Sequence, residues 1–199
     1  MTDASSDPGR PARRAPSPAA ARRKLLLIAA ICVAPVVASY AFYYLSPHGS
    51  FVNYGTLLPI APAPALDGTR SDGAPFALAD LRGRWVLLVD ARDRCDAPCE
   101  RLLYASRQAR TMQGREQDRI VRLLLLPEGA APDAALVAEH PGLVVAHVGA
   151  AARAGLPGGG GAIYVIDPLG NLVLRYGAEP DIKGLSKDLG RLLKASGIG

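Results

Sequence analysis

The sequence predicts an α/β domain behind a single N-terminal transmembrane helix, and three observations predict it. Residues 25–45 form a run of 21 residues without a charge, close to the roughly 20 residues that cross a bilayer as a helix. Beyond residue 75, short apolar runs typical of buried strands alternate with stretches of helical spacing. Two cysteines, Cys95 and Cys99, lie between one such strand and one such helix.

The positive charge of the chain lies at its amino terminus. Residues 1–24 contain six bases and two acids, a net charge of +4, whereas the whole chain carries +5. The segment is rich in Pro, Ala and Ser and has no apolar periodicity, which predicts a disordered, basic cytoplasmic tail. Because the rest of the chain is nearly neutral, it has no basic face for nucleic acid, and we exclude that class of partner.

The apolar run has the features of a membrane anchor. Pro35 is tolerable in a transmembrane helix, and tyrosines gather at its far end, as in an aromatic belt. The bases precede the run, and the first charge after it is Asp67. This predicts a single pass through a bacterial inner membrane, with the carboxy-terminal domain in the periplasm. A cleaved signal peptide is the alternative, but its apolar core is normally about 7–15 residues.

Residues 46–75 contain several prolines and glycines and predict a tether and an irregular lead-in. Residues 76–199 are expected to form the folded domain. We expect strands at 85–89, 120–126, 143–148, 163–166 and 172–176, the last two joined by a turn over 167–171. Three helices are expected. The first follows Cys99 and has an apolar stripe that includes Met112, the second spans 132–140, and the third ends the chain. This order is that of a thioredoxin-like fold, with Trp85 expected in its core.

The cysteine pair carries the chemistry that the sequence suggests. Cys95 is expected at a strand exit and Cys99 in the first helical turn, with Pro98 suited to a helix start. Free amide groups there stabilise a thiolate. Residues four apart on a helix share a face, so the pair can close a disulfide or present two soft sulfurs to Cu(I). A structural disulfide is the alternative interpretation, although so short a loop constrains the unfolded chain little.

Several motifs together resemble the Sco/SenC family of cytochrome c oxidase assembly proteins. They are Leu81-Arg-Gly-Arg-Trp-Val, the Cys95-x-x-x-Cys99 pair and Ile163-Tyr-Val-Ile-Asp-Pro-Leu-Gly. Three more segments resemble a divergent, membrane-anchored proteobacterial branch of cytochrome c oxidase biogenesis-like proteins: Asn53-Tyr-Gly-Thr-Leu, Arg107-Gln-Ala-Arg and Lys187-Asp-Leu-Gly-Arg-Leu-Leu-Lys-Ala-Ser. The resemblance implies a thioredoxin-like fold, copper held by two cysteines and one histidine, and a cytochrome c oxidase subunit or another periplasmic thiol or copper protein as partner.

Cys95 and Cys99 match the cysteine ligands of that family, but the histidine has no counterpart. The family places it about eight residues before the acid of the Asp-Pro-x-Gly turn, and that position is Gly159. His48, His140 and His147 are other histidines of the chain, each expected to be a solvated or core residue. Cu(I) can bind two sulfurs without a histidine, whereas Cu(II) binding should be much weakened. Cys32, in the apolar run, is expected to be inert.

Three hypotheses of different classes follow. The first is a metallochaperone that holds Cu(I) through Cys95 and Cys99 and delivers it to an oxidase subunit. The second is a thiol:disulfide reductant of the oxidase's copper-site cysteines, in which Cys95 attacks and Cys99 resolves the mixed disulfide. The cis-proline usual in such oxidoreductases is not evident, since Pro157 lies too early in the sequence. The third is a non-catalytic assembly scaffold.

Overall fold

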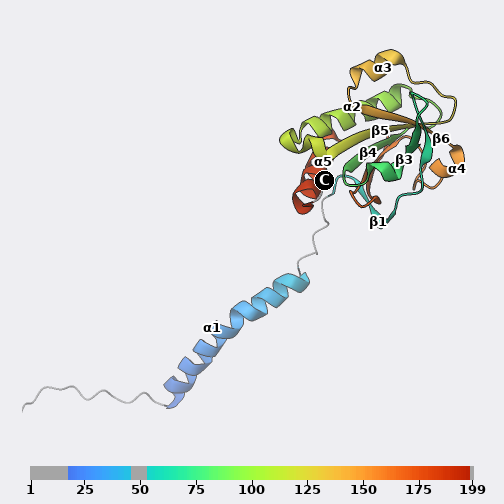
Figure 1. Ribbon diagram of the computed structural model, residues 1–199. Coiled ribbons are helices and arrows are strands. Elements are labelled where there is room, and N and C mark those ends of the chain that lie inside the picture. The colour runs from blue at the N-terminus through green and yellow to red at the C-terminus, as the bar shows by residue number, and fades with distance from the viewer. Residues whose placement is uncertain (1–17, 46–52, 198–199) are drawn as a thin grey trace, which may run out of the picture. The chain divides into compact units, whose positions relative to one another are not determined.

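The computed structural model describes residues 18–45 and 53–197, and the chain forms two compact units, Met1–Phe51 and Val52–Gly199. The first unit contains α1 (Pro18–Leu45), a helix of 28 residues with Pro35 inside it. Its segment Arg22–Phe42 is long and apolar enough to span a membrane, with a mean hydropathy of 2.4 (Figure 1).

The helix begins earlier than the sequence pattern predicts. Residues 18–24, expected in the disordered tail, are helical. Pro18 suits the first position of a helix, and the alanines, arginines and lysine that follow it are good helix formers. Residues 1–17 of the expected tail lie outside the described part of the chain.

The second unit is built on a mixed sheet of eight strands in the order β1-β8-β7-β4-β5-β6-β2-β3. The strands are β1 (Thr56–Pro62), β2 (Asp67–Arg70), β3 (Pro75–Ala77), β4 (Trp85–Asp90), β5 (Ile120–Leu126), β6 (Leu143–Val148), β7 (Ala162–Ile166) and β8 (Asn171–Tyr176). The central strands β4, β5 and β6 are parallel, and β7 runs antiparallel to β4. The predicted strands 120–126 and 143–148 are confirmed, and β4, β7 and β8 each extend the prediction by one residue.

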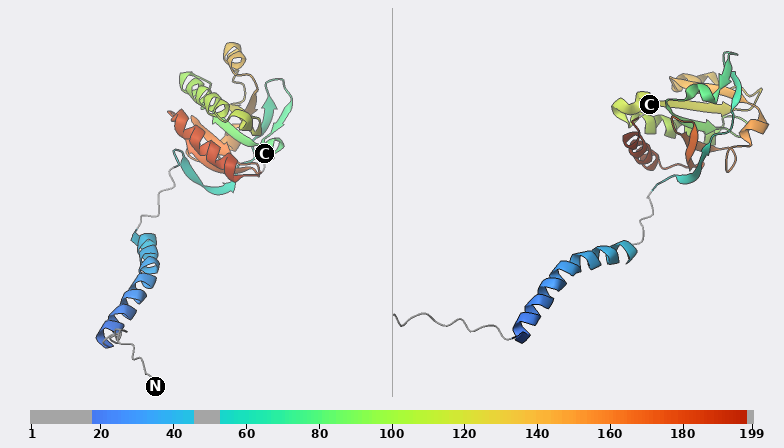
Figure 2. Two further views of the ribbon diagram at one scale, coloured as in Figure 1. Left: turned by 90° about the vertical axis from the view of Figure 1, so that its left-hand side faces the viewer. Right: turned by 60° about the horizontal axis from the view of Figure 1, so that its bottom comes forward.

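Helices complete the domain. They are α2 (Ala97–Thr111), α3 (Ala134–Glu139), α4 (Ala150–Arg153) and α5 (Ile182–Ala195), with the 3-10 turns η1 (Leu78–Leu81) and η2 (Gly114–Arg119). The two long helices, α2 and α5, lie side by side on one face of the sheet (Figure 2). The apolar stripe of α5 packs into the core through Leu185, Leu189 and Leu193. Met112, expected on the stripe of α2, is instead 55% exposed because α2 ends at Thr111.

Burial on both faces of the sheet produces two cores. Alternate residues of β4 point to opposite sides, so Trp85 and Leu87 join α2 and α5 in one core, while Val86 and Leu88 join the other. All residues of β4 and β5 are buried, as their mainly apolar sequences predict, including the charged residues Asp90 and Arg122. This places the carboxyl end of β4, and the cysteine loop that follows it, on a rigid support.

The expected tether at 46–75 is wrong for its described part. This segment contributes β1 at one edge of the sheet, and β2 followed by β3 at the other. Tyr54 and Gly55 are fixed even before β1, because their amide groups donate to the carboxylate of Asp188 on α5 at 2.7 and 3.1 Å. β1 is an edge strand, where proline is tolerated, and β2 is only four residues long, so composition alone did not distinguish these strands from a linker.

Candidate functional site

The cysteine loop joins the end of β4 to the start of α2. Asp96 is the N-cap of α2, and its side chain accepts a hydrogen bond from the amide of Cys99 at 3.4 Å. Pro98 occupies the first turn, where its missing N–H removes no helix hydrogen bond. Cys99 therefore lies in the first helical turn, as the sequence predicts. The cap was not part of that prediction, although Asp before a helix is a common N-cap signal.

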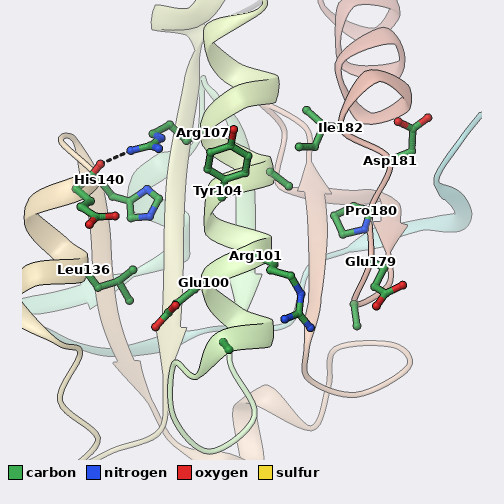
Figure 3. A pocket seen from close by; sticks show the side chains of 14 residues that line it. Glu100, Arg101, Tyr104, Arg107, Leu136, His140, Glu179, Pro180, Asp181 and Ile182 are labelled. Atoms are coloured by element: carbon green, nitrogen blue, oxygen red, sulfur yellow. Dashed lines mark hydrogen bonds between the residues drawn. The ribbon is translucent and has the colours of Figure 1, made fainter.

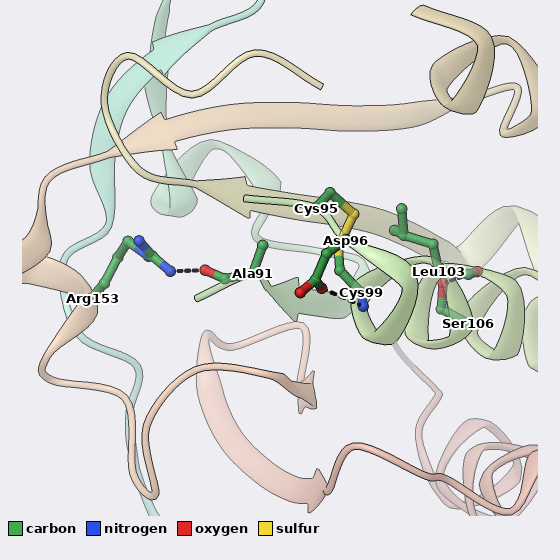
Figure 4. Close-up of a disulfide and its surroundings, with 7 residues drawn as sticks. All are labelled: Ala91, Cys95, Asp96, Cys99, Leu103, Ser106 and Arg153. Carbon is green, nitrogen blue, oxygen red and sulfur yellow. Dashed lines mark hydrogen bonds between the residues drawn. A yellow bond between two sulfur atoms is a disulfide. The ribbon is translucent and has the colours of Figure 1, made fainter. Parts of the chain in front are cut away.

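Cys95 and Cys99 form a disulfide with a Cα–Cα distance of 5.0 Å (Figure 4). The two sulfur-bearing residues differ in exposure: Cys99 is 4% exposed and part of the core, whereas Cys95 is half-buried at its edge. An incoming thiol or metal ion can thus reach Cys95 more easily than Cys99.

A cavity of about 570 Å³ opens beside the disulfide. The cysteine loop supplies most of its lining, including Arg92, Arg94 and Cys99, and two distant segments supply Gly161 and Ala178. Asp93 and Asp96 line the same cavity, so two guanidinium groups and two carboxylates stand at the approach to the sulfurs.

The glycine loop before β7 packs against the base of the cysteine loop. The amide of Gly161 donates to the carbonyl of Asp90 at 2.7 Å, and Arg92 Nε donates to the carbonyl of Gly160 at 3.2 Å. A Cβ atom on Gly160 would lie 3.0 Å from Asp90 Oδ2 and 3.1 Å from Arg92 Cγ, so a side chain there would require these neighbours to shift by a few tenths of an ångström. Gly159, at the position expected for the family histidine, is exposed with φ of +71°. Among the described residues no peptide bond is cis.

A buried ion pair lies under the same loop. Arg153, at the end of α4, donates to the carboxylate of Asp90, the last residue of β4, at 2.7 Å. The side chains are 10% and 3% exposed. Burial raises the pKa of Asp90, and the charge and hydrogen bond of Arg153 oppose that rise. Arg153 also donates to the carbonyls of Ala91 and Arg92.

The described histidines have other partners. His140 is 3% exposed, and its Nδ1 accepts a hydrogen bond from Arg122 at 3.2 Å. His147 donates through Nδ1 to the carbonyl of Pro127 at 3.3 Å. His48 lies outside the described residues. Within residues 18–45 and 53–197, no three His, Cys, Asp or Glu side chains gather as a metal site.

These contacts define the chemistry that the site can support. The two sulfurs suit a soft ion of low coordination number such as Cu(I), but the part of the chain with described positions adds no imidazole for Cu(II). Disulfide exchange requires one accessible sulfur and one neighbour that can displace it, and the pair provides both.

The comparisons with known proteins agree with this architecture. Residues 85–196 match the family described as "Transmembrane-like, thioredoxin-like, C-terminal domain". The chain belongs to this family. The match covers more than half of the 199 residues, and it includes the cysteine loop, the glycine loop and both long helices. No curated protein matches the sequence.

Solved structures share the thioredoxin-like fold at low identity. Copper-bound ScoI of Arabidopsis thaliana has a TM-score of 0.57 and 17% identity, covering 68% of this chain and 100% of that one. Copper-bound ScoI of Bradyrhizobium japonicum has a TM-score of 0.52 and 18% identity, covering 66% and 99%. The thioredoxin domain of a thiol-disulfide oxidoreductase from Bacteroides vulgatus has a TM-score of 0.51 and 15% identity, covering 68% and 99%.

The sequence pattern indicates both cysteines but not the residues that hold their loop. Asp90 carries a weak signal, since it is the one charged residue of a strand that is otherwise apolar. Arg153 carries none, because it is 63 residues away on a helix of four residues. Only the packing of α4 against the end of β4 brings them together.

Proposed function

We propose that this chain is a membrane-anchored thiol–disulfide exchange protein that acts, through Cys95 and Cys99, on the copper-site cysteines of a cytochrome c oxidase subunit during assembly. The observation that carries the proposal is the unequal burial of the linked cysteines, Cys99 in the core and Cys95 at its edge. Similarity to a thiol-disulfide oxidoreductase domain and to Sco proteins supports the reaction class. The Sco/SenC resemblance of the sequence motifs supports the partner.

The reaction is a pair of exchanges. The Cys95 thiolate of the reduced protein attacks one sulfur of the partner's disulfide, and the partner's other sulfur leaves as a thiolate. The Cys99 thiolate then attacks Cys95, which closes the Cys95–Cys99 disulfide and releases the second partner thiolate. The partner gains two electrons and this chain loses them, so a dithiol reductant must restore the pair after each turnover.

The anchor fixes where this chemistry would occur. α1 is long and apolar enough to cross the membrane, and the family description includes a transmembrane-like part. With the basic tail in the cytoplasm, the domain would face the periplasm, where oxidase copper-site cysteines tend to form disulfides. A tether of this kind would confine the domain to the membrane surface, where the oxidase subunit is assembled.

Delivery of Cu(I) is the second candidate function, and the adjacent sulfurs favour it. Reduction of the disulfide would leave two thiolates side by side, a donor set that prefers Cu(I) to harder cations. Copper-bound Sco structures share the fold. With glycine at position 159, the expected histidine ligand is missing, and for this reason we rank copper delivery below thiol exchange.

One set of purified variants distinguishes the functions. The full chain in detergent is equilibrated with glutathione buffers to obtain the reduction potential of the pair. The Cys99→Ser variant is then incubated with an oxidised peptide that carries the two copper-site cysteines of an oxidase subunit. A potential near that of the compartment, together with a mixed disulfide at Cys95, is the expected result. Cys32→Ser, which changes the free cysteine of α1, is the matched control and should behave as the wild type.

Copper binding is measured on the same reduced protein by anaerobic competition with a chromophoric Cu(I) chelator. Tight one-to-one binding of Cu(I) that is lost in Cys95→Ser, combined with no mixed disulfide between Cys99→Ser and the peptide, would establish the carrier function instead. A cell in which the double Cys→Ser variant supports oxidase assembly, while deletion does not, would show that the chain acts as a scaffold.

A further inference from the structure

A groove of about 700 Å³ runs along α2 (Figure 3), next to the cavity that Cys99 lines. α3 borders it on one side, and the segment between β8 and α5 borders it on the other. Ala178 lines both the groove and the cysteine cavity. A chain segment that reaches Cys95 can therefore continue into the groove without leaving the surface.

The middle of the groove is apolar. Tyr104, on the second turn of α2, is 48% exposed, which is unusual for so large an aromatic side chain on a core helix. Leu136 of α3 lies on one side of it, and Pro180 and Ile182 lie on the other. Arg107 stands over the Tyr104 ring at 5.5 Å and donates to the carbonyl of Glu139 at 2.5 Å, so it holds the ring in place.

The rim of the groove is mainly acidic. Carboxylates outnumber guanidinium groups among the charged residues that line the groove. The acidic residues are Glu100, Glu139, Glu179 and Asp181, and the basic residues are Arg101 and Arg107. The guanidinium of Arg107 is already engaged with the Glu139 carbonyl and the Tyr104 ring. All four acids are exposed. An excess of exposed carboxylates around an apolar floor complements a segment with an apolar side chain and a cation.

We infer that this groove binds a segment of the partner thiol protein that carries an apolar residue followed by a lysine or arginine, a few residues from its reactive cysteine. The inference rests on the proposed function and adds the partner's recognition chemistry to it. Tyr104 is five residues after Cys99, or about 7.5 Å along the helix axis at 1.5 Å per residue. The partner's cysteine is bonded to Cys95, whose Cα atom lies 5.0 Å from that of Cys99, so an extended chain at about 3.3 Å per residue needs about three or four residues from its cysteine to its apolar residue.

The test uses the full chain in detergent with Cys32→Ser and Cys99→Ser, which leaves Cys95 as its only thiol out of three cysteines. The probe is the peptide Cys-Gly-Gly-Leu-Lys, and its reversed sequence is tested in parallel, each activated as a mixed disulfide with thionitrobenzoate. Attack by the Cys95 thiolate forms the peptide–Cys95 disulfide and releases thionitrobenzoate, whose absorbance gives the rate. The comparison peptide is Cys-Gly-Gly-Ser-Glu, activated in the same way.

We expect Cys-Gly-Gly-Leu-Lys, or its reverse, to react about tenfold faster than the comparison peptide, which corresponds to about 1.4 kcal/mol. Reversing the rim charge with Glu100→Lys and Glu179→Lys should remove this preference, and Tyr104→Ser should reduce it. Glu128→Lys is the matched control, because Glu128 is an exposed glutamate that lines a different cavity. It should keep the preference. The activated neutral thiol 2-mercaptoethanol should react equally with all of these variants.

Equal rates for the peptides, with normal reaction of activated 2-mercaptoethanol, would overturn the groove inference and leave the proposed function intact. Failure of Cys95 to react even with activated 2-mercaptoethanol would overturn both. If a second copy of this chain occupies the groove, the second-order rate constants for both peptides should fall as the protein concentration rises. That result would also overturn the inference.

Discussion

Arg153 and Asp90 form an ion pair at 2.7 Å directly below the cysteine loop. The same guanidinium donates to the carbonyls of Ala91 and Arg92, the first two residues after β4 (Figure 4). One side chain on α4 thus neutralises a buried carboxylate and satisfies two carbonyl groups of the loop that leads to Cys95. The position of the disulfide therefore depends on a contact between segments that are far apart in the sequence.

Replacement of Arg153 should destabilise the domain. Arg153→Met leaves the Asp90 carboxylate buried without a counter-charge and two loop carbonyls without a donor, and we expect a loss of about 3 kcal/mol in the free energy of unfolding. Denaturant unfolding followed by fluorescence of Trp85, the one tryptophan and 4% exposed, measures it. Asp118→Asn, which breaks an exposed pair with Arg110 at 3.4 Å, should cost under about 1 kcal/mol. Equal losses of stability in both variants would contradict the stabilising role of the ion pair between Arg153 and Asp90.

The buried histidine should make the domain less stable in mild acid. Burial, and then the charges of Arg122 and Arg107, lower the pKa of His140 below its usual 6.5, against a smaller opposing effect of Glu139. The unfolded chain then binds more protons than the folded one between the folded pKa and 6.5. Stability is full above pH 6.5 and falls as the pH drops below it toward the folded pKa. His140→Gln should remove this slope, and an unchanged slope would contradict the prediction.

The carboxylate of Asp188 should be needed for the docking of residues 54–55. It accepts hydrogen bonds from the hydroxyl of Tyr176 at 2.7 Å, from the amides of Tyr54 and Gly55, and from the guanidinium of Arg191 at 3.3 Å. Asp188 is 1% exposed, so Asp188→Ala would leave four donors without this acceptor and should cost about 3 kcal/mol. Tyr176→Phe removes one donor and should cost about 1 kcal/mol. Proteolysis within residues 46–56 should accelerate in Asp188→Ala, and Tyr176→Phe should resemble the wild type more closely.

Restoring a histidine at position 159 should change the copper chemistry. A Cβ atom there meets no atom within 4 Å, so Gly159→His has room for its side chain, although the positive φ costs about 1 kcal/mol. We expect the reduced variant to gain Cu(II) binding, detected by its thiolate-to-copper absorption, because imidazole adds a third ligand. Gly83→His is the control, since Gly83 also has positive φ and open space around it. Equal Cu(II) binding by both variants would contradict a role for position 159.

The elements that surround the site follow largely from local sequence pattern. Continuous apolar runs predict β4 and β5 because both faces of each strand are buried, and the spacing of leucines predicts α5. The strands β1 and β2 were not predicted, since β1 is an edge strand that tolerates proline, and β2 is a polar strand of only four residues. Met112 was misplaced because periodicity does not show where a helix ends.

The sequence by itself determined the apolar helix, the strand–loop–helix that holds Cys95 and Cys99, and the glycine at position 159, because each depends on residues that are close in the chain. The tertiary structure decided which cysteine is buried, which cation lies under their loop and which segments border the groove along α2. These features depend on residues far apart in the sequence, such as Cys99 and Ala178, which line one cavity only after the sheet has ordered its strands. The physical reason is that burial and charge pairing are properties of the packed chain, while helix and strand patterns are properties of its neighbouring residues.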